Sequence, residues 1–572
     1  MKIMFHMMDL VGPQNACIGL GQILIRRGHE VYFLGNEKFC PKFERYGFKL
    51  CPMRESESRV NLSEENPVKQ FIQFMIDNGI FTYKPIIEKM QILAPKKNGD
   101  IYAKCVDFQP QAKRYLEEIK PDFLVIDSDI IMPCLINANI PWALLFCSNP
   151  VGCFDSDQLP PFTSGLPIDG DRSEWDKYRQ VSNVAHFQMT IDFQNKLSDM
   201  FNYPRVEGQR FVPHSPYLNI YQYPAELDYD DVIKIPDNFV RVDAFCREEA
   251  GSFTVPEKLR SKMSPGDKLI FLSLGSMGSC DIALMKKIVA ILSKTKHYYI
   301  VAKGLLHDQY DLPDNMWGEA VVPQTKVLPL VDLVIMHGGN NTLTEAFSFG
   351  KPTIVLPIFY DQPDNAQRVQ DKRFGIRIDT YRFEEDDLLN AIETILADDE
   401  LKQRLADASK RIQTTNSKEL ACIAIENTIL KLDVSNSQSS DVKFIDFDYS
   451  NYSYRGTDLG RYFVDCAQPE QFHSNDLIAD DEMIQFLQWY HQESCLIHGE
   501  EYANDERNSV ECLWNEAKLF AMFSFMVDVI FCIYMANEKF KLNNVEQMES
   551  FLLLSDQRYQ GYLKYRKRFF PQ

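Results

Sequence analysis

The sequence lacks the metal-binding and charge patterns of several protein classes. Its 14 cysteines include no CxxC pair and no cysteine–histidine cluster at zinc-site spacing. Positive charge is in deficit, because 61 Lys and Arg residues face 81 Asp and Glu residues, which gives a net charge of −20. We therefore expect free thiols in a reducing compartment and a cytoplasmic location. We expect no nucleic-acid partner, because the overall electrostatic field of an acidic protein repels a phosphate backbone. Any anionic ligand must be bound by local groups.

Long apolar runs are nearly absent. The run at 519–536, LFAMFSFMVDVIFCIYMA, has 18 residues and carries Asp528 near its centre. A bilayer requires about 20 apolar residues, and a central Asp costs about 2.5–3.5 kcal/mol on insertion scales. We predict a buried helix of a soluble domain there and no transmembrane segment. The N-terminal MKIMFHMMDL is too short and too polar for a secretory signal and predicts a strand.

Strand and helix patterns alternate in two parts of the chain. Apolar runs such as KIMFHMM, HEVYFLG and DFLVIDS alternate with amphipathic ones in the first 150 residues, and the rhythm restarts at Asp267 with KLIFLSLG. This order predicts βαβ units, parallel sheets and two doubly wound domains in tandem. The aromatic, Pro-rich segment Val151–Asp231 predicts a partly helical insert, and Glu384–Leu432 predicts a closing helical tract.

One motif-rich region is suited to a nucleotide. The strand predicted at Val331–Met336 leads into His337-Gly338-Gly339, and Asn341-Thr342 then opens a predicted helix. Such a junction exposes unpaired backbone N–H groups and the positive end of a helix dipole, which suits a diphosphate. One turn later, Glu345 offers acceptors for two ribose hydroxyls. Asp361-Gln362 follows the next strand, at the edge where open α/β sheets bind ligands.

These residues closely resemble the signature of the UDP-glycosyltransferase family. VPQ, HGGNNT, Glu345, GKP and DQPDNA follow one another in family order, and the likeness extends over residues 1–432 through LSLGS, PDNFVRVDAFCR and VGPQNACIGLGQILIRRGHEVYFL. The resemblance implies an α/β fold of two tandem Rossmann-like domains, the glycosyltransferase B fold. It also implies inverting transfer of a hexose from a UDP-sugar to a small lipophilic acceptor, as in detoxifying conjugation, without a cofactor or metal.

The resemblance also assigns donor-binding roles. Gln324 would contact the uracil edge, Glu345 the ribose, and Asp361 and Gln362 the sugar. The residues implied for the diphosphate are Gly275, Ser276, His337, Gly338, Gly339, Asn341 and Thr342.

Two positions depart from the family pattern. The family's general base is a His in a turn after the first strand, and the alignment of VGPQNACIGLGQ with that turn puts Pro13 at the His position. The matching orienting carboxylate, Asp127, is present, and His6 lies seven positions too early to replace the base. Val321 stands where the family commonly has an aromatic platform for uracil, so donor affinity should be weakened by about 1–3 kcal/mol.

The C-terminal region carries a second group of unusual residues. A predicted strand ends in Asp446-Phe447-Asp448, a carboxylate pair of the kind that holds Mg²⁺ beside nucleotide phosphates. The run Tyr449–Asp458 and the helix-rich tail to Phe570 strongly resemble the C-terminal half of choline/ethanolamine kinases. By this resemblance Asp446 would be the metal ligand and Asp458 a structural anchor.

The kinase-like segment lacks what phosphoryl transfer needs. The catalytic His-x-Asp loop and a nucleotide-binding N-lobe are missing, and the cation–π tryptophans expected for choline fall on Asp528 and Phe531. We therefore expect Asp446 to be a vestigial Mg²⁺ ligand. The predicted organisation is an acceptor domain at 1–246, a linker at 247–265, a UDP-sugar-binding domain at 266–432, a linker at 433–441 and a mostly helical kinase-like C-lobe fragment at 442–572.

Three functions remain open on this basis. The first is a UDP-glycosyltransferase whose activity is impaired at Pro13, and the second is an inactive protein that binds a nucleotide sugar or a lipophile. The third is a choline/ethanolamine kinase, which the missing catalytic loop opposes. Acceptor contacts should come from 151–166 and 175–211, but the residues there name neither the acceptor nor the sugar.

Overall fold

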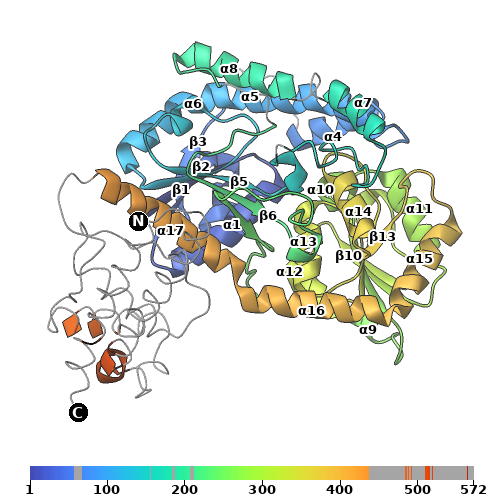
Figure 1. Cartoon of the computed structure of the whole chain (residues 1–572). Helices are drawn as coiled ribbons and strands as arrows, with labels where there is room; N and C mark the ends of the chain where they lie inside the picture. The colour runs from blue at the N-terminus through green and yellow to red at the C-terminus, as the bar shows by residue number, and fades with distance from the viewer. Residues whose placement is uncertain are drawn as a thin grey trace, which may run out of the picture. The chain divides into compact units, whose positions relative to one another are not determined.

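The computed structural model describes residues 1–56, 67–154, 156–182, 187–206 and 211–436, together with isolated residues between 484 and 563. The chain divides into two compact units, Met1–Leu430 and Lys431–Gln572. The first unit contains two Rossmann-like domains (Figure 1). Asp446 and the apolar run at 519–536 lie outside the described residues.

The first domain is built on a parallel sheet of seven strands in the order β3-β2-β1-β4-β5-β6-β7. Apolar runs such as FLVID form its central strands and are buried along their whole length, because helices cover both faces of the sheet. The strands are β1 (Lys2–Met7), β2 (Glu30–Asn36), β3 (Lys49–Met53), β4 (Phe123–Asp127), β5 (Trp142–Phe146), β6 (Leu218–Gln222) and β7 (Phe239–Val242).

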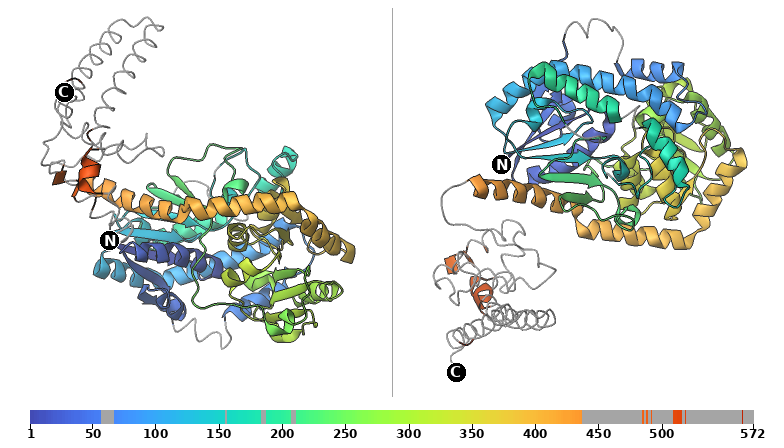
Figure 2. Two further views of the ribbon diagram at one scale, coloured as in Figure 1. Left: turned by 90° about the horizontal axis from the view of Figure 1, so that it is seen from below. Right: turned by 45° about the horizontal axis from the view of Figure 1, so that its top comes forward.

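Helices connect these strands, and the long α5 packs beside α8 on one side of the sheet (Figures 1 and 2). The insert predicted between 151 and 231 is partly helical and supplies α7 and α8. The helical elements of the first domain are α1 (Val11–Arg26), η1 (Glu37–Phe39), α2 (Cys40–Glu44), α4 (Pro67–Asp77), α5 (Ile86–Ile119), α6 (Pro133–Ile136), η2 (Pro150–Gly152), α7 (Arg172–Ser182), α8 (Met189–Phe201) and η4 (Ala225–Leu227).

The second domain repeats this architecture with six parallel strands in the order β10-β9-β8-β11-β12-β13. Its strands are β8 (Leu269–Ser273), β9 (Tyr298–Ala302), β10 (Met316–Glu319), β11 (Leu333–Met336), β12 (Thr353–Val355) and β13 (Gly375–Arg377). Its helical elements are α9 (Glu257–Arg260), α10 (Gly275–Gly278), α11 (Ile282–Leu292), η5 (His307–Gln309), α12 (Gln324–Val327), η6 (Leu328–Leu330), α13 (Asn340–Ser348), α14 (Gln362–Asp371), α15 (Glu385–Ala397) and α16 (Asp399–Thr415).

The last helix of the unit, α17 (Ser417–Asn436), returns to the first domain. Ala421, Cys422 and Ile425 are buried in the same hydrophobic cluster as β1 and α1. Arg27 at the end of α1 forms ion pairs with Glu419 (3.1 Å) and Glu426 (2.7 Å) of α17. The chain therefore begins and ends this unit on the same sheet.

The predicted fold class is confirmed, whereas several boundaries differ. The strand predicted from Val331 begins at Leu333, because the Val331 N–H closes the η6 turn on Leu328 O. The backbone stays helical to Asn436, so α17 runs into the segment 433–441 that was predicted as a linker. Among the described residues, no helix combines the length and the apolar character that a membrane span needs.

Candidate functional site

Three neighbouring strands of the second sheet bring the predicted donor-binding residues to one edge. In the order β8-β11-β12, the segment after β8 supplies Gly275, His337 follows β11 directly, and the loop after β12 leads to Asp361. The carboxyl ends of adjacent parallel strands form the ligand-binding edge of open α/β sheets. Residues that are far apart in the sequence thus meet in one place.

The His337 ring lies between two glycines. A Cβ atom at Gly275 would lie 2.5 Å from His337 Nε2, and a Cβ atom at Gly339 would lie 2.4 Å from it, so a side chain at either position would displace the His337 ring. Gly275 also has a φ of +73° and Gly338 a φ of +88°, which glycine adopts most readily. Burial lowers the pKa of His337 to about 4, so the imidazole is neutral at neutral pH.

The α13 helix begins one residue earlier than predicted, at Asn340, with Gly339 as its N-cap residue. Glu345 is buried on this helix, and its carboxylate accepts from Gln324 Nε2 at 2.6 Å and pairs with Arg247 Nη1 at 3.3 Å. Gln324 Nε2 also lies 3.3 Å from the Thr342 hydroxyl. Burial raises the pKa of Glu345, and the Arg247 charge opposes this shift.

Amide side chains at the start of α13 tie the two domains together. Asn341 Nδ2 donates to Gly12 O at 2.8 Å, at the first turn of α1. Asn340 Nδ2 lies 2.9 Å from Gln222 O and 3.1 Å from Cys147 O. The contact of Asn341 with the diphosphate stays a prediction, and in the structure its amide bonds across the domain boundary.

The predicted sugar-binding pair also makes internal bonds. Asp361 Oδ2 accepts from the backbone N–H of Asn149 at 3.0 Å, and burial raises the pKa of Asp361 to about 7. Gln362 Oε1 accepts from the backbone N–H groups of Ile358 (2.9 Å) and Phe359 (3.2 Å) and so shapes the loop after β12. Ser276 follows Gly275 in the short helix α10.

The predicted base position contains no titratable side chain. Pro13 is buried in the first turn of α1, which begins at Val11, so the expected turn is helical here. Proline is tolerated there because the first N–H groups of a helix have no intrahelical partner.

Asp127 is buried at the end of β4, its Oδ2 has no hydrogen-bond partner, and burial raises its pKa to about 7. His6 is buried in β1 with Nδ1 bound to Leu34 O at 3.0 Å, so it is committed to the neighbouring strand.

Val321 is 84% exposed, which places it on the open rim of this edge, three residues before Gln324. An aromatic ring at this position would have room to stack on a base. The branched aliphatic side chain provides no such platform.

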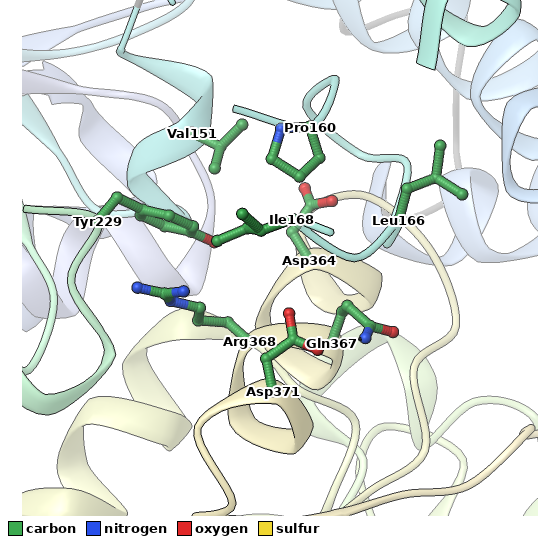
Figure 3. Close-up of a pocket in the computed structure, with 9 residues that line it drawn as sticks. All are labelled: Val151, Pro160, Leu166, Ile168, Tyr229, Asp364, Gln367, Arg368 and Asp371. Carbon is green, nitrogen blue, oxygen red and sulfur yellow. Dashed lines mark hydrogen bonds between the residues drawn. The ribbon is translucent and has the colours of Figure 1, made fainter. Parts of the chain in front are cut away.

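The insert of the first domain packs closely on α14 of the second. A crevice of about 10 Å³, room for about one water molecule, separates Val151 and Pro160 from Asp364 and Arg368 (Figure 3). Asp364 accepts the backbone N–H groups of Thr163 and Gly165, both at 2.7 Å. The contact between insert and helix is therefore direct and hydrogen-bonded.

The structure adds polar residues that the sequence did not single out. Asn340 and Asn365 lie inside the quoted motifs, but only the fold reveals their partners, since Asn365 donates to Gly338 O at 2.9 Å and bonds to Asn149. Arg247 ends the quoted stretch PDNFVRVDAFCR but was given no role there, and Lys42 comes from outside the motifs. Across the described residues, no group of three or more His, Cys, Asp or Glu side chains is arranged to hold a metal ion.

Two family models match the chain. Residues 268–417 match the family described as UDP-glucoronosyl and UDP-glucosyl transferase, and residues 384–563 match the choline/ethanolamine kinase family. The two matches overlap at 384–417, where α15 packs against α11 and β12 and α16 packs against α13. In the structure the overlapping residues thus belong to the second Rossmann-like domain.

Individual relatives agree with the first match. The chain is 24% identical over 422 residues to the NDP-glycosyltransferase YjiC of Bacillus subtilis. This alignment covers 73% of the chain and 94% of that protein. It is 25% identical over 449 residues to a sterol 3-beta-glucosyltransferase of Saccharomyces cerevisiae. That alignment covers 73% of the chain and 34% of the yeast protein. The crystal structure of the glycotransferase of kitacinnamycin superposes with a TM-score of 0.54 at 18% identity and covers 75% of this chain and 99% of its own.

Proposed function

We propose that residues 1–432 transfer a hexose from a UDP-sugar to a small lipophilic acceptor with inversion, because residues 268–417 match the family of UDP-glucoronosyl and UDP-glucosyl transferases and residues 384–563 match the choline/ethanolamine kinase family. The observation that carries this proposal is the edge formed by β8, β11 and β12. There, a glycine-lined His337 precedes the N-terminus of α13, and a buried Glu345 follows one turn later.

The donor would lie along this edge. The diphosphate faces the N-terminus of α13, where backbone N–H groups and the helix dipole favour negative charge. His337 is neutral and serves as a hydrogen-bond partner rather than a cation. The ribose hydroxyls bind Glu345, so the nucleotide replaces the present hydrogen bond between Gln324 and Glu345 and frees Gln324 for the uracil edge. Asp361 and Gln362 hold the hexose.

An aromatic cluster next to Asp361 supports an apolar acceptor. The rings of Phe162 and Phe211 lie 4.9 Å apart, and their centroids lie 5.6 Å and 6.2 Å from the ring of Tyr360. Phe162 and Phe211 come from the insert of the first domain, where acceptor contacts were predicted. Phe162 and Phe211 are buried, so an acceptor that enters between the insert and Tyr360 would meet an apolar, aromatic wall. A sterol is the acceptor named for one of the relatives, which agrees with a lipophilic class.

Pro13 determines which acceptors react. In an inverting transfer, the acceptor atom bonds to the anomeric carbon as the bond to UDP breaks, and the acceptor loses a proton. A general base contributes about 10²–10⁴-fold to such a step, and Pro13 provides none. Alcohols and phenols should therefore react slowly. Thiols that ionise near neutrality, and amines that attack while neutral, depend less on a base.

The second candidate function is binding of a nucleotide sugar or lipophile without turnover, and the observation that favours it is Pro13 in the first turn of α1. Kinase activity has less support. The kinase match begins at residue 384, inside the second Rossmann-like domain, and the sequence contains no catalytic His-x-Asp loop ahead of Asp446.

A transfer assay separates the first two functions. The full-length chain is incubated with UDP-glucose and a phenol, an amine or a thiol, and released UDP and glycosylated product are both measured. Transfer to the amine or thiol supports the enzyme, whereas UDP binding without any product supports the binding protein. Pro13→His should raise phenol transfer at least about tenfold, and Pro13→Ala is the matched control that adds no base. Equal rates for the two variants with every acceptor would refute the role assigned to position 13.

A further inference from the structure

The proposed donor site has little positive charge of its own. A UDP-sugar carries a negatively charged diphosphate. The donor-site residues of the second domain are neutral or acidic: Gly275, Ser276, Gln324, His337, Gly339, Asn341, Thr342, Gln362, Glu345 and Asp361. The chain as a whole has a net charge of −20. Any cation that binds the diphosphate therefore comes from elsewhere in the fold.

Lys42 of α2 is a largely buried cation on the facing domain. Its Nζ donates to Gln14 Oε1 and Asn15 Oδ1, both at 3.0 Å, on the first turn of α1. Two amide oxygens leave the third proton of the ammonium group uncommitted. Within the described part of the chain, no carboxylate lies within ion-pairing distance of Lys42.

The surroundings of Lys42 connect it to the donor site. Asn341 Nδ2 bonds to Gly12 O, so the N-terminus of α13 meets the same turn of α1 that holds Lys42. The charged and titratable groups that face Lys42 are Arg247, Glu249 and Cys17. Arg247 is paired with both Glu345 (3.3 Å) and Glu249 (2.5 Å) and is thus already neutralised. Burial and the Arg247 charge lower the pKa of Lys42 to about 8, whereas burial raises the pKa of the Cys17 thiol well above its usual range.

We propose that Lys42 binds the diphosphate of the donor from the first domain, opposite the N-terminus of α13. This inference rests on the proposed function, because it names a further ligand of the same donor site. A bound anion relieves the cost of holding a buried ammonium without an ion pair. It also links the two domains through the donor.

The test is calorimetric titration of the full-length chain with UDP and with uridine. Lys42→Met removes the charge and keeps the apolar stem. UDP should bind about tenfold to a hundredfold more weakly, as expected for a lost charge-assisted hydrogen bond, and uridine should bind as in wild type. The matched control is Lys38→Met, which removes an exposed charge on the adjacent η1 turn and should change neither affinity. An unchanged UDP affinity in Lys42→Met, or an equal loss for uridine, would overturn the assignment.

The pH dependence provides a second measurement on the wild-type chain. Because a phosphate loses its second proton near pH 6, UDP keeps a constant phosphate charge above pH 7, whereas free Lys42 loses its proton around pH 8. The dissociation constant for UDP, divided by that for uridine, should rise about fourfold from pH 7 to pH 8.5. Lys42→Arg stays charged and should bind UDP without this rise. If Lys42→Met does not fold, the pH dependence of wild type and of Lys42→Arg tests the role of Lys42. A wild-type ratio of the UDP and uridine dissociation constants that does not change with pH refutes the inference. Wild type that fails to bind UDP at any pH refutes the proposed function itself.

Discussion

The buried carboxyl group of Asp127 has a measurable cost at neutral pH. Burial raises its pKa to about 7 from the ordinary value of 3.8, although the neighbouring Cys147 thiol donates a hydrogen bond to it. A carboxyl group whose pKa is raised on folding stabilises the folded state most when protonated, so stability falls as the pH rises from about 4 to about 7. Each pKa unit corresponds to about 1.4 kcal/mol, which gives a cost of about 4 kcal/mol at pH 8.

Asp127→Asn keeps the shape of the side chain and removes its ionisation. Between pH 5 and pH 8, the free energy of unfolding of the variant should rise relative to wild type by about 3 kcal/mol. The measurement is urea denaturation of the full chain at pH 5, 6, 7 and 8, followed by near-UV circular dichroism. The comparison across pH cancels any constant effect of the new amide.

The neighbouring Asp129 is the control. It is equally buried, but its Oδ2 pairs with Lys97 Nζ at 2.5 Å. Asp129→Asn leaves the partly buried Lys97 ammonium without its ion pair and should lower the free energy of unfolding by about 3 kcal/mol at pH 8. This change is opposite in sign to the one expected for Asp127→Asn. The reasoning is refuted if Asp127→Asn differs from wild type by the same amount at every pH, or if both variants lose stability at pH 8.

Two further substitutions test the domain contacts and the donor rim. Arg411→Ala removes the ion pairs to Glu226 (2.7 Å) and to the buried Asp243 (2.6 Å), so the free energy of unfolding should fall by about 3 kcal/mol in a urea titration. The control is Arg205→Ala, which breaks an exposed ion pair and should lower the free energy of unfolding by less than about 1 kcal/mol. Val321→Trp should strengthen uridine binding about fivefold or more through stacking, as measured by calorimetry, and an affinity equal to that of Val321→Ala would show that position 321 does not face the base.

The sequence predicts the sheets well because their physical cause is local. Strands such as FLVID and LIFLS are continuous apolar runs between polar turns, and both faces of a parallel sheet bury them. The order of strand, glycine turn and helix around His337 likewise follows from neighbouring residues. The position of the donor edge then follows from the topology of parallel sheets.

The partners of the polar side chains were not predictable in this way. Asn341 bonds to Gly12, and Lys42 bonds to Gln14 and Asn15, through contacts that depend on how two domains and two helices meet. No local pattern in the sequence contains that information. Pro13 shows the same limit, since the sequence aligned it with a turn, whereas the residue lies in a helix whose first N–H groups tolerate proline.

The return of α17 to the first sheet makes the second domain an insertion within the first. The chain crosses into it after Arg247 and leaves it at Asn416, whose φ of +52° marks the joint between α16 and α17. The same arrangement makes residues 257–415 an exchangeable cassette: replacing it between two fixed junctions should transplant donor preference when the new α14 keeps the Asp364 bonds to Thr163 and Gly165 of the insert.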